Sequence, residues 1–169
     1  RLPEAWIAPP QTRELRELVR YRAKLVAIRS GLKAQIHAVL AKAGVLIVVS
    51  LASQKAYVFK DGELWGSSAV STGRKGKRTP TGRYTILEKQ VHHRSRTYDN
   101  APMPYMQRLT WGGVALHAGY VTGRPASHGC IRLPRSFAKK LYNLTDFGST
   151  TVVVTDKKAR SSDEALKAG

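Results

Sequence analysis

The sequence contains one cysteine, Cys130, among its 169 residues. A single cysteine excludes an internal disulfide and any zinc site built from several thiolates. No apolar run approaches the roughly 18 residues that span a bilayer, and the longest, residues 45–49, has the length of a strand. The first residues are polar and charged where a secretory signal peptide would be apolar. We therefore expect neither a transmembrane segment nor a signal peptide within this chain.

Acidic residues are also scarce. The chain has 11 Asp and Glu against 29 Lys and Arg, a net charge of +18. This charge predicts attraction to polyanions, such as nucleic acid, anionic lipid or anionic wall polymers. However, the cations are spread along the sequence, which is more typical of a solubilising surface than of a protein that reads bases, so nucleic acid is not the expected partner. With 42% apolar residues, the chain can build a core.

The sequence changes character at Gly44. Residues 12–43 predict one long basic helix, with Thr12 as its N-cap and Gly44 as its stop. Apolar residues recur along it every seven positions, at Leu18, Leu25, Leu32 and Val39. Arg22 and Arg29 interrupt this stripe, so two interpretations stay open: an amphipathic helix that docks on a partner face, or an extended solvated helix.

After Gly44 the pattern is that of short strands. Alternating and β-branched apolar residues predict strands within 45–73, 82–90, 110–118 and 149–156, and residues 134–144 predict one short helix opened by a proline. The last residues, 157–169, are polar and are expected to fray. The prediction is a mainly β, sandwich-like domain with mostly antiparallel strands over residues 45–156, preceded by a long helix over 1–44 and followed by a polar tail.

Cys130 lies in the stretch SHGC, whose flanking residues suit a turn better than a core. Gly129 lets the backbone approach a substrate, and the N–H groups of Gly129 and Cys130 could face a developing oxyanion. His117 ends a predicted strand that could aim its ring at this turn, and a neighbouring imidazole favours a reactive thiolate. The alternatives are a buried, inert thiol and, for the base, His128, which could instead brace the loop and hold Ser127.

Three motifs carry a resemblance to a known family: TPTGRYTI at 79–86, MPYMQRLTWGGVALHAG at 103–119 and SHGCIRLP at 127–134. With them, residues 45–156 resemble the catalytic domain of L,D-transpeptidases, the YkuD-like family. The resemblance implies a β-sandwich domain with a Cys130 nucleophile, His117 as proton donor and acceptor, and the Ala118 carbonyl as the group that orients this ring. Arg132, Tyr105 and Met103 would lie beside the substrate.

This resemblance implies an acyltransferase of peptidoglycan biosynthesis and cell wall organisation, with a bearing on cell shape. Cys130 would form a thioester with a peptidoglycan stem peptide, which then yields a 3-3 cross-link or, by hydrolysis, a trimmed stem. Neither a cofactor nor a metal is needed, and the implied location is the periplasm or the cell wall. Within TPTG, Pro80 and Gly82 are interpreted as turn residues, and Trp111 is expected to pack.

Two further patterns are weaker. His92 and His93 could suggest a metal site, but only Asp99 is a nearby carboxylate, so an exposed basic loop over the cleft is the expectation. Residues 2–44 resemble the linking helix of insertion-element transposases with an Asp-Glu-Asp-Asp catalytic set, through LPEAWIAPP, RELRELVRYRAKLV and GLKAQIHAVLAKAG. That family's catalytic carboxylates have no counterparts here. The alternative function is therefore a DNA-binding transposase remnant without catalysis.

Overall fold

The computed structural model describes residues 9–42 and 44–168, with side chains of residues 31–42 excepted, and divides into two compact units, 1–40 and 41–169. The first unit contains helix α1, Pro10–Lys42. The helix begins two residues before the predicted Thr12 cap, which fits the preference of proline for a first turn. Leu18 and Leu25 of the predicted apolar stripe are exposed, whereas Leu32 and Val39 fall outside the described side chains.

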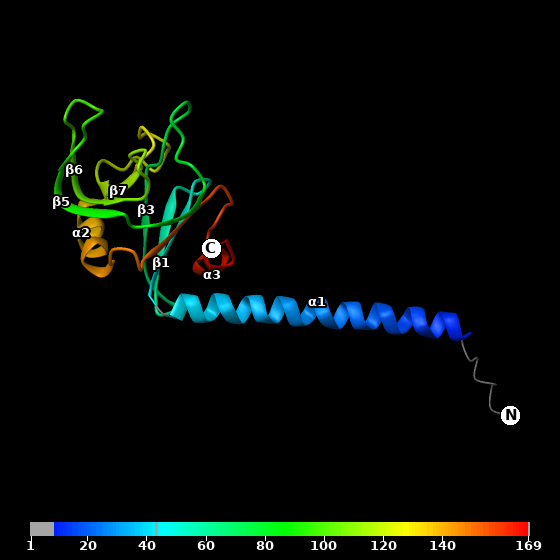
Figure 1. Ribbon diagram of the computed structural model, residues 1–169. Helices are drawn as coiled ribbons and strands as arrows, with labels where there is room; N and C mark the ends of the chain where they lie inside the picture. Colours follow the sequence, from blue (N-terminus) through cyan, green and yellow to red (C-terminus); the bar gives the residue numbers. More distant parts are fainter. Residues whose placement is uncertain (1–8, 43, 169) are drawn as a thin grey trace. The chain divides into compact units, whose positions relative to one another are not determined.

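The second unit contains two mixed β-sheets (Figure 1). The first has the order β3-β2-β1-β9-β4, formed by Glu63–Ala69, Lys55–Lys60, Val45–Ser50, Thr151–Thr155 and Gly82–Thr85. Strands β1 and β2 form a hairpin pair, β1 and β9 are parallel, and Asp61 and Gly62 turn the chain into β3 with positive φ angles of 52° and 85°. Such angles match the tight turn predicted from Asp-Gly.

The second sheet has the order β5-β6-β7-β8, formed by Glu88–Arg94, Pro102–Arg108, Ala115–Ala118 and Ile131–Leu133. Strands β7 and β8 are parallel, with Leu116 beside Ile131 and His117 beside Arg132. The predicted helix is present as α2, Arg135–Leu144, and contacts β6 and β7. The mainly β, sandwich-like prediction is thus confirmed.

The main core is formed by alternate residues of strands from both sheets. Ile47, Val49, Val152 and Val154 of the first sheet share one cluster with Leu116, Ile131 and Leu133 of the second sheet and with Ala138 and Leu141 of α2. Because successive strand residues point to opposite faces, this burial leaves His117 and Arg132 on the face of the second sheet that lies away from the cluster. The core thereby fixes where the candidate catalytic ring emerges.

Three sequence-based expectations were wrong. The predicted strand over 82–90 is two strands, β4 and β5, in different sheets, and β6 and β8 were not foreseen. His92 and His93 belong to β5 rather than to a loop. The C-terminal residues do not fray: they form α3, Ser162–Ala168, because the fully buried Ala159 and Ala165 cover the second face of the first sheet.

Candidate active site

Cys130 occupies the residue just before β8 and is half-buried. Its Sγ donates a weak hydrogen bond to the Gly113 carbonyl over 3.4 Å. Burial raises the pKa of the Cys130 thiol, whereas a backbone hydrogen bond from Ala115 and the charges of Arg132 and Arg108 act in the opposite direction. The resting group is therefore a neutral thiol at neutral pH, and it needs a base to become a nucleophile.

His117 lies on β7, in the strand next to the one that Cys130 precedes. The ring is 7% exposed, and its Nδ1 donates to the Ala118 carbonyl over 2.9 Å. A carbonyl only accepts hydrogen bonds, so Nδ1 carries the proton and Nε2 keeps its lone pair. Burial lowers the pKa of His117; the Ala118 contact opposes this shift, and the charge of Arg132 adds to it. His117 is thus a neutral imidazole, available as a base.

No hydrogen bond joins the Cys130 thiol to the His117 ring among the described residues. Arg132 pairs with His117 across β7 and β8, and its charge lowers the pKa of both His117 and Cys130. His117 and Arg132 therefore share the outer face of the second sheet, and Cys130 precedes Arg132 by two residues on the segment that leads into β8. Catalytic hydrogen bonds are often long or absent before a substrate is bound, so a resting structure without this bond is consistent with such a pair.

Ser127 and Gly129 shape the loop that carries Cys130. The buried Ser127 hydroxyl donates to the Cys130 carbonyl and accepts from the Gly129 N–H over 3.1 Å. Gly129 has a φ of +119°, which other residues rarely adopt. The expectation that the Gly129 N–H faces an oxyanion is wrong in this conformation, because Ser127 occupies this donor.

Sequence reasoning missed the role of Thr79. Its buried hydroxyl donates to the Gly129 carbonyl over 2.8 Å and accepts from the Gly73 N–H over 2.9 Å. Thr79 thus fastens the TPTG segment to the loop of Cys130. A Cβ on Gly73 would lie 2.0 Å from the Lys77 carbonyl oxygen, so only glycine permits this close passage of the chain. The motif is visible in the sequence, but nothing there distinguishes a buried anchor from a turn residue.

His128, the rival base, is exposed and points to other partners. Its Nε2 is 2.8 Å from Nη2 of Arg74, and its ring stacks on Tyr98 with centroids 4.6 Å apart. Arginine only donates, so Nε2 accepts and His128 is neutral in this contact. Desolvation and the charges of Arg74, Arg132 and Lys77 lower the pKa of His128. This arrangement matches the loop-bracing alternative better than a base aimed at Cys130.

The other residues predicted to lie beside the substrate are on two different strands, Arg132 on β8 and Met103 and Tyr105 on β6. Arg132 has no ion-pair partner among the described residues, and its side chain passes within 3.2 Å of where a Cβ on Gly119 would be. Met103 pairs with His93 across β6 and β5. Tyr105 packs on α2 instead of the Cys130 loop: its ring meets that of Tyr142 at 5.9 Å, and the Arg135 guanidinium lies over it.

Trp111 does not pack as expected but is 79% exposed, two residues before the carbonyl that holds the thiol. No group of three or more His, Cys, Asp or Glu that could hold a metal ion occurs within the described part of the chain. His93 instead bonds to Gln90, 2.7 Å away, and Glu88 is paired with Arg108. The charged groups that act on Cys130 are therefore two cations, Arg132 and Arg108, and Arg108 is paired with Glu88.

Comparisons with known proteins identify the family of this domain. The family model described as the L,D-transpeptidase catalytic domain, YkuD, matches residues 44–154. No curated protein matches the sequence. A solved L,D-transpeptidase of Stackebrandtia nassauensis is 34% identical, with a TM-score of 0.62 over 70% of this chain and 58% of its own. One from Mycobacterium tuberculosis is 27% identical, with a TM-score of 0.63 over 66% of this chain and 57% of its own.

L,D-transpeptidase 3 of Mycobacterium tuberculosis, solved with a faropenem-derived adduct, is 27% identical, with a TM-score of 0.60 over 66% of this chain and 60% of its own. The chain thus corresponds to well under two thirds of the length of these proteins. The family match does not include residues 1–43, and none of these comparisons points to a transposase or to a nucleic-acid partner.

Proposed function

Because the chain belongs to the YkuD family of L,D-transpeptidase catalytic domains, we propose that it is a cysteine acyltransferase of peptidoglycan stem peptides. One observation carries the proposal. His117 has its Nδ1 proton held by the Ala118 carbonyl and its Nε2 without a hydrogen bond to any described residue, and its strand β7 pairs with β8, the strand that Cys130 precedes. This is the arrangement of a general base and a thiol nucleophile.

The first step is removal of the thiol proton. Nε2 of His117 takes it as the substrate enters and the Sγ–Gly113 contact is lost. The charge of Arg132 favours the thiolate but disfavours the imidazolium that forms. The Ala118 carbonyl compensates, since its hydrogen bond to Nδ1 becomes stronger when the ring is charged.

The thiolate then attacks the carbonyl carbon at the L-centre of the third stem residue. A C–S bond forms, and the carbonyl oxygen carries the negative charge of the tetrahedral intermediate. The Cys130 N–H is the loop donor that remains for this oxygen, because the Gly129 N–H is bonded to Ser127. When the intermediate collapses, the C–N bond breaks, and the terminal D-amino acid leaves with the proton that His117 returns to its nitrogen.

The resulting thioester has two fates. An amine of a second stem, deprotonated by His117, attacks the thioester carbon and gives a 3-3 cross-link with release of the Cys130 thiol. Water, deprotonated in the same way, gives a trimmed stem and makes the enzyme an L,D-carboxypeptidase. Both reactions run through the same two residues, so the acceptor present decides between transferase and hydrolase.

Substrate recognition follows from the charges around Cys130. Arg132 has a guanidinium without an acidic partner in the described part of the chain, and its planar fork suits a carboxylate. We assign it to a free carboxylate of the stem peptide, and we assign Met103, on β6 of the same sheet, to an apolar contact with the substrate. Tyr105 supports β6 from the α2 side and acts on the substrate only through that strand.

Peptidoglycan as substrate assigns the working location to the periplasm or the cell wall. Among the described residues, no helix is both long and apolar enough to cross a membrane. The net charge of +18 fits a protein that works among anionic wall polymers.

The proposal is tested by incubating the protein with a stem tetrapeptide, alone and with an acceptor stem, and separating the products by liquid chromatography with mass detection. We expect a tripeptide with water alone and a cross-linked dimer when the acceptor is added. Only unchanged tetrapeptide in both mixtures, from protein shown to be folded, would refute the proposal.

A further inference from the structure

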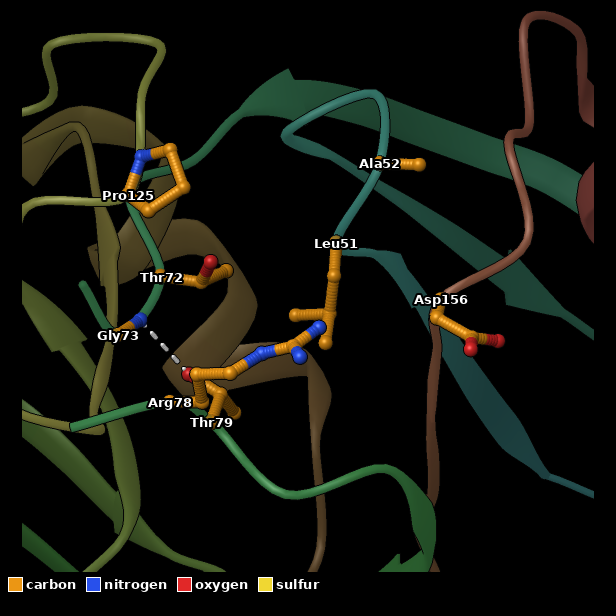
Figure 2. A pocket seen from close by; sticks show the side chains of 8 residues that line it. All are labelled: Leu51, Ala52, Thr72, Gly73, Arg78, Thr79, Pro125 and Asp156. Atoms are coloured by element: carbon orange, nitrogen blue, oxygen red, sulfur yellow. Dashed lines mark hydrogen bonds between the residues drawn. The ribbon is translucent and has the colours of Figure 1, made fainter. Parts of the chain in front are cut away.

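A hollow of about 170 Å³ lies at the end of the first sheet, outside the catalytic site. It is bounded by the β1–β2 turn, the residue after β9 and the segment that leads into TPTG (Figure 2). The lining residues are Leu51, Ala52, Thr72, Gly73, Arg78, Thr79, Pro125 and Asp156. Neither Cys130 nor His117 is among them. The volume is below the roughly 300–1,000 Å³ of pockets for drug-sized ligands, so it suits a molecule of only a few heavy atoms.

Two opposite charges line this hollow without being paired. The Arg78 guanidinium and the Asp156 carboxylate make neither an ion pair nor a hydrogen bond with any described residue. Figure 2 shows the Arg78 side chain reaching toward Leu51, while Asp156 comes from a separate segment. A ligand with a negative and a positive end could satisfy both residues at once.

The rest of the lining favours a small ligand with a short apolar part. Leu51, Ala52 and Pro125 offer apolar surface. The Thr72 hydroxyl accepts a hydrogen bond from Gln54 Nε2 over 2.7 Å, which leaves its own proton to donate. A carboxylate is the acceptor that would use this donor together with a guanidinium.

From this geometry we propose that the hollow binds a free α-amino acid with a small side chain. The carboxylate of the amino acid pairs with Arg78 and accepts from Thr72, and its ammonium pairs with Asp156. The short side chain packs against the apolar wall formed by Leu51 and Pro125. Amino acids with long side chains do not fit the volume, and molecules with only one of the two charges leave either Arg78 or Asp156 without an ionic partner.

The hollow is connected to the catalytic loop through its own lining. Thr79 donates to the Gly129 carbonyl, next to Cys130, and the Thr72 carbonyl accepts from the N–H groups of Ala126 and Ser127. A ligand that orders residues 72–79 would also restrict this loop, so occupancy should change the rate at which Cys130 reacts. The inference does not depend on which acyl transfer the enzyme performs.

Isothermal titration calorimetry with glycine or D-alanine tests the proposal on the full chain. We expect saturable binding of both, and no saturation with acetate or methylamine, each of which carries one of the charges. Arg78→Gln and Asp156→Asn should each weaken binding about tenfold or more, the loss of one charge-assisted contact. Lys75→Gln, which removes an exposed cation of the same segment outside the hollow, should bind as the wild type does.

Cys130→Ser tests whether binding needs the catalytic thiol. It should bind glycine as tightly as the wild type, and saturating glycine should change the rate of Cys130 alkylation by iodoacetamide in the wild type but not in Arg78→Gln. Binding that is lost in Cys130→Ser, or kept in both Arg78→Gln and Asp156→Asn, would overturn the proposal. Absence of binding to the folded wild type would do the same, and it would leave the acyl transfer untouched.

Discussion

The substitution Thr79→Val isolates the contact that holds the catalytic loop in place. Valine has nearly the shape of threonine, but it lacks the hydroxyl that joins the Gly73 N–H to the Gly129 carbonyl. Thr79 is 3% exposed, so water does not readily replace either partner. A buried polar group left without a partner costs about 1–3 kcal/mol, so leaving two of them without a partner should destabilise the domain by about 2–6 kcal/mol.

Thr79→Ser is the matched control. It keeps the hydroxyl and loses one methyl group, which should cost about 1 kcal/mol. Urea unfolding of both variants, followed by circular dichroism with the slope compared to the wild type, gives the two free energies. The reasoning is refuted if Thr79→Val is no less stable than Thr79→Ser.

The same pair of variants tests whether the anchor positions the nucleophile. Gly129, at a φ of +119°, is held by Thr79 from one side and by Ser127 from the other. Without Thr79 the loop should sample more conformations, so acylation by a stem peptide should slow while alkylation by a small thiol reagent is kept or becomes faster. Equal slowing of both reactions would instead indicate that the thiol itself became less reactive.

Three other predictions follow from the site. His117→Ala should slow acylation by about 10²–10⁴, measured by stopped-flow with a stem peptide, and a larger loss for His128→Ala would reverse the assignment of the base. Because burial lowers the pKa of His117, the acylation rate should fall on acidification only below the ordinary histidine pKa of about 6.5. The free energy of unfolding should fall in the same pH range, since the unfolded chain binds the proton more readily. A rate that already falls on acidification while the pH is still above 7 would contradict this. Removal of residues 1–43 should leave a folded, active domain, because the family match begins at Gly44 and the Gly44 carbonyl accepts a hydrogen bond from the Asp61 N–H. An inactive or insoluble product would show that the helix completes the domain.

Where sequence and structure agree, the agreement comes from local chemistry. Strand β1 is rich in β-branched residues, α2 follows a proline, and the Asp61-Gly62 turn has the positive φ angles that these residue types favour. The pairing of His117 with Cys130 was inferred from the turn residues around Cys130 and from the family resemblance, and it stays a prediction. The parallel register that brings His117 beside Arg132 is what the motifs themselves do not state.

The structure differs from the sequence-based predictions where contacts between residues far apart in the sequence determine the local conformation. The C-terminal segment is polar in sequence, but Ala159 and Ala165 pack against an apolar face of the first sheet, and the Tyr57 hydroxyl donates a hydrogen bond to the Ala159 carbonyl. His93 looked like a loop residue because β6, its partner strand, contains two prolines, which normally weaken a strand prediction. The hydroxyl of Thr79 could not be recognised as an anchor, since Gly129 lies 50 residues away.

The most direct test of the account is the intact mass of the protein after mixing with a stem tetrapeptide or a carbapenem. We expect a covalent adduct on Cys130: for the tetrapeptide, its mass less the terminal D-amino acid, joined as a thioester that hydroxylamine removes. Cys130→Ser should form no adduct while melting close to the wild type, because the swap is small and a hydroxyl is far less ionised than a thiol. An adduct that persists in Cys130→Ser, or that maps to another residue, would contradict the assignment of Cys130 as the nucleophile.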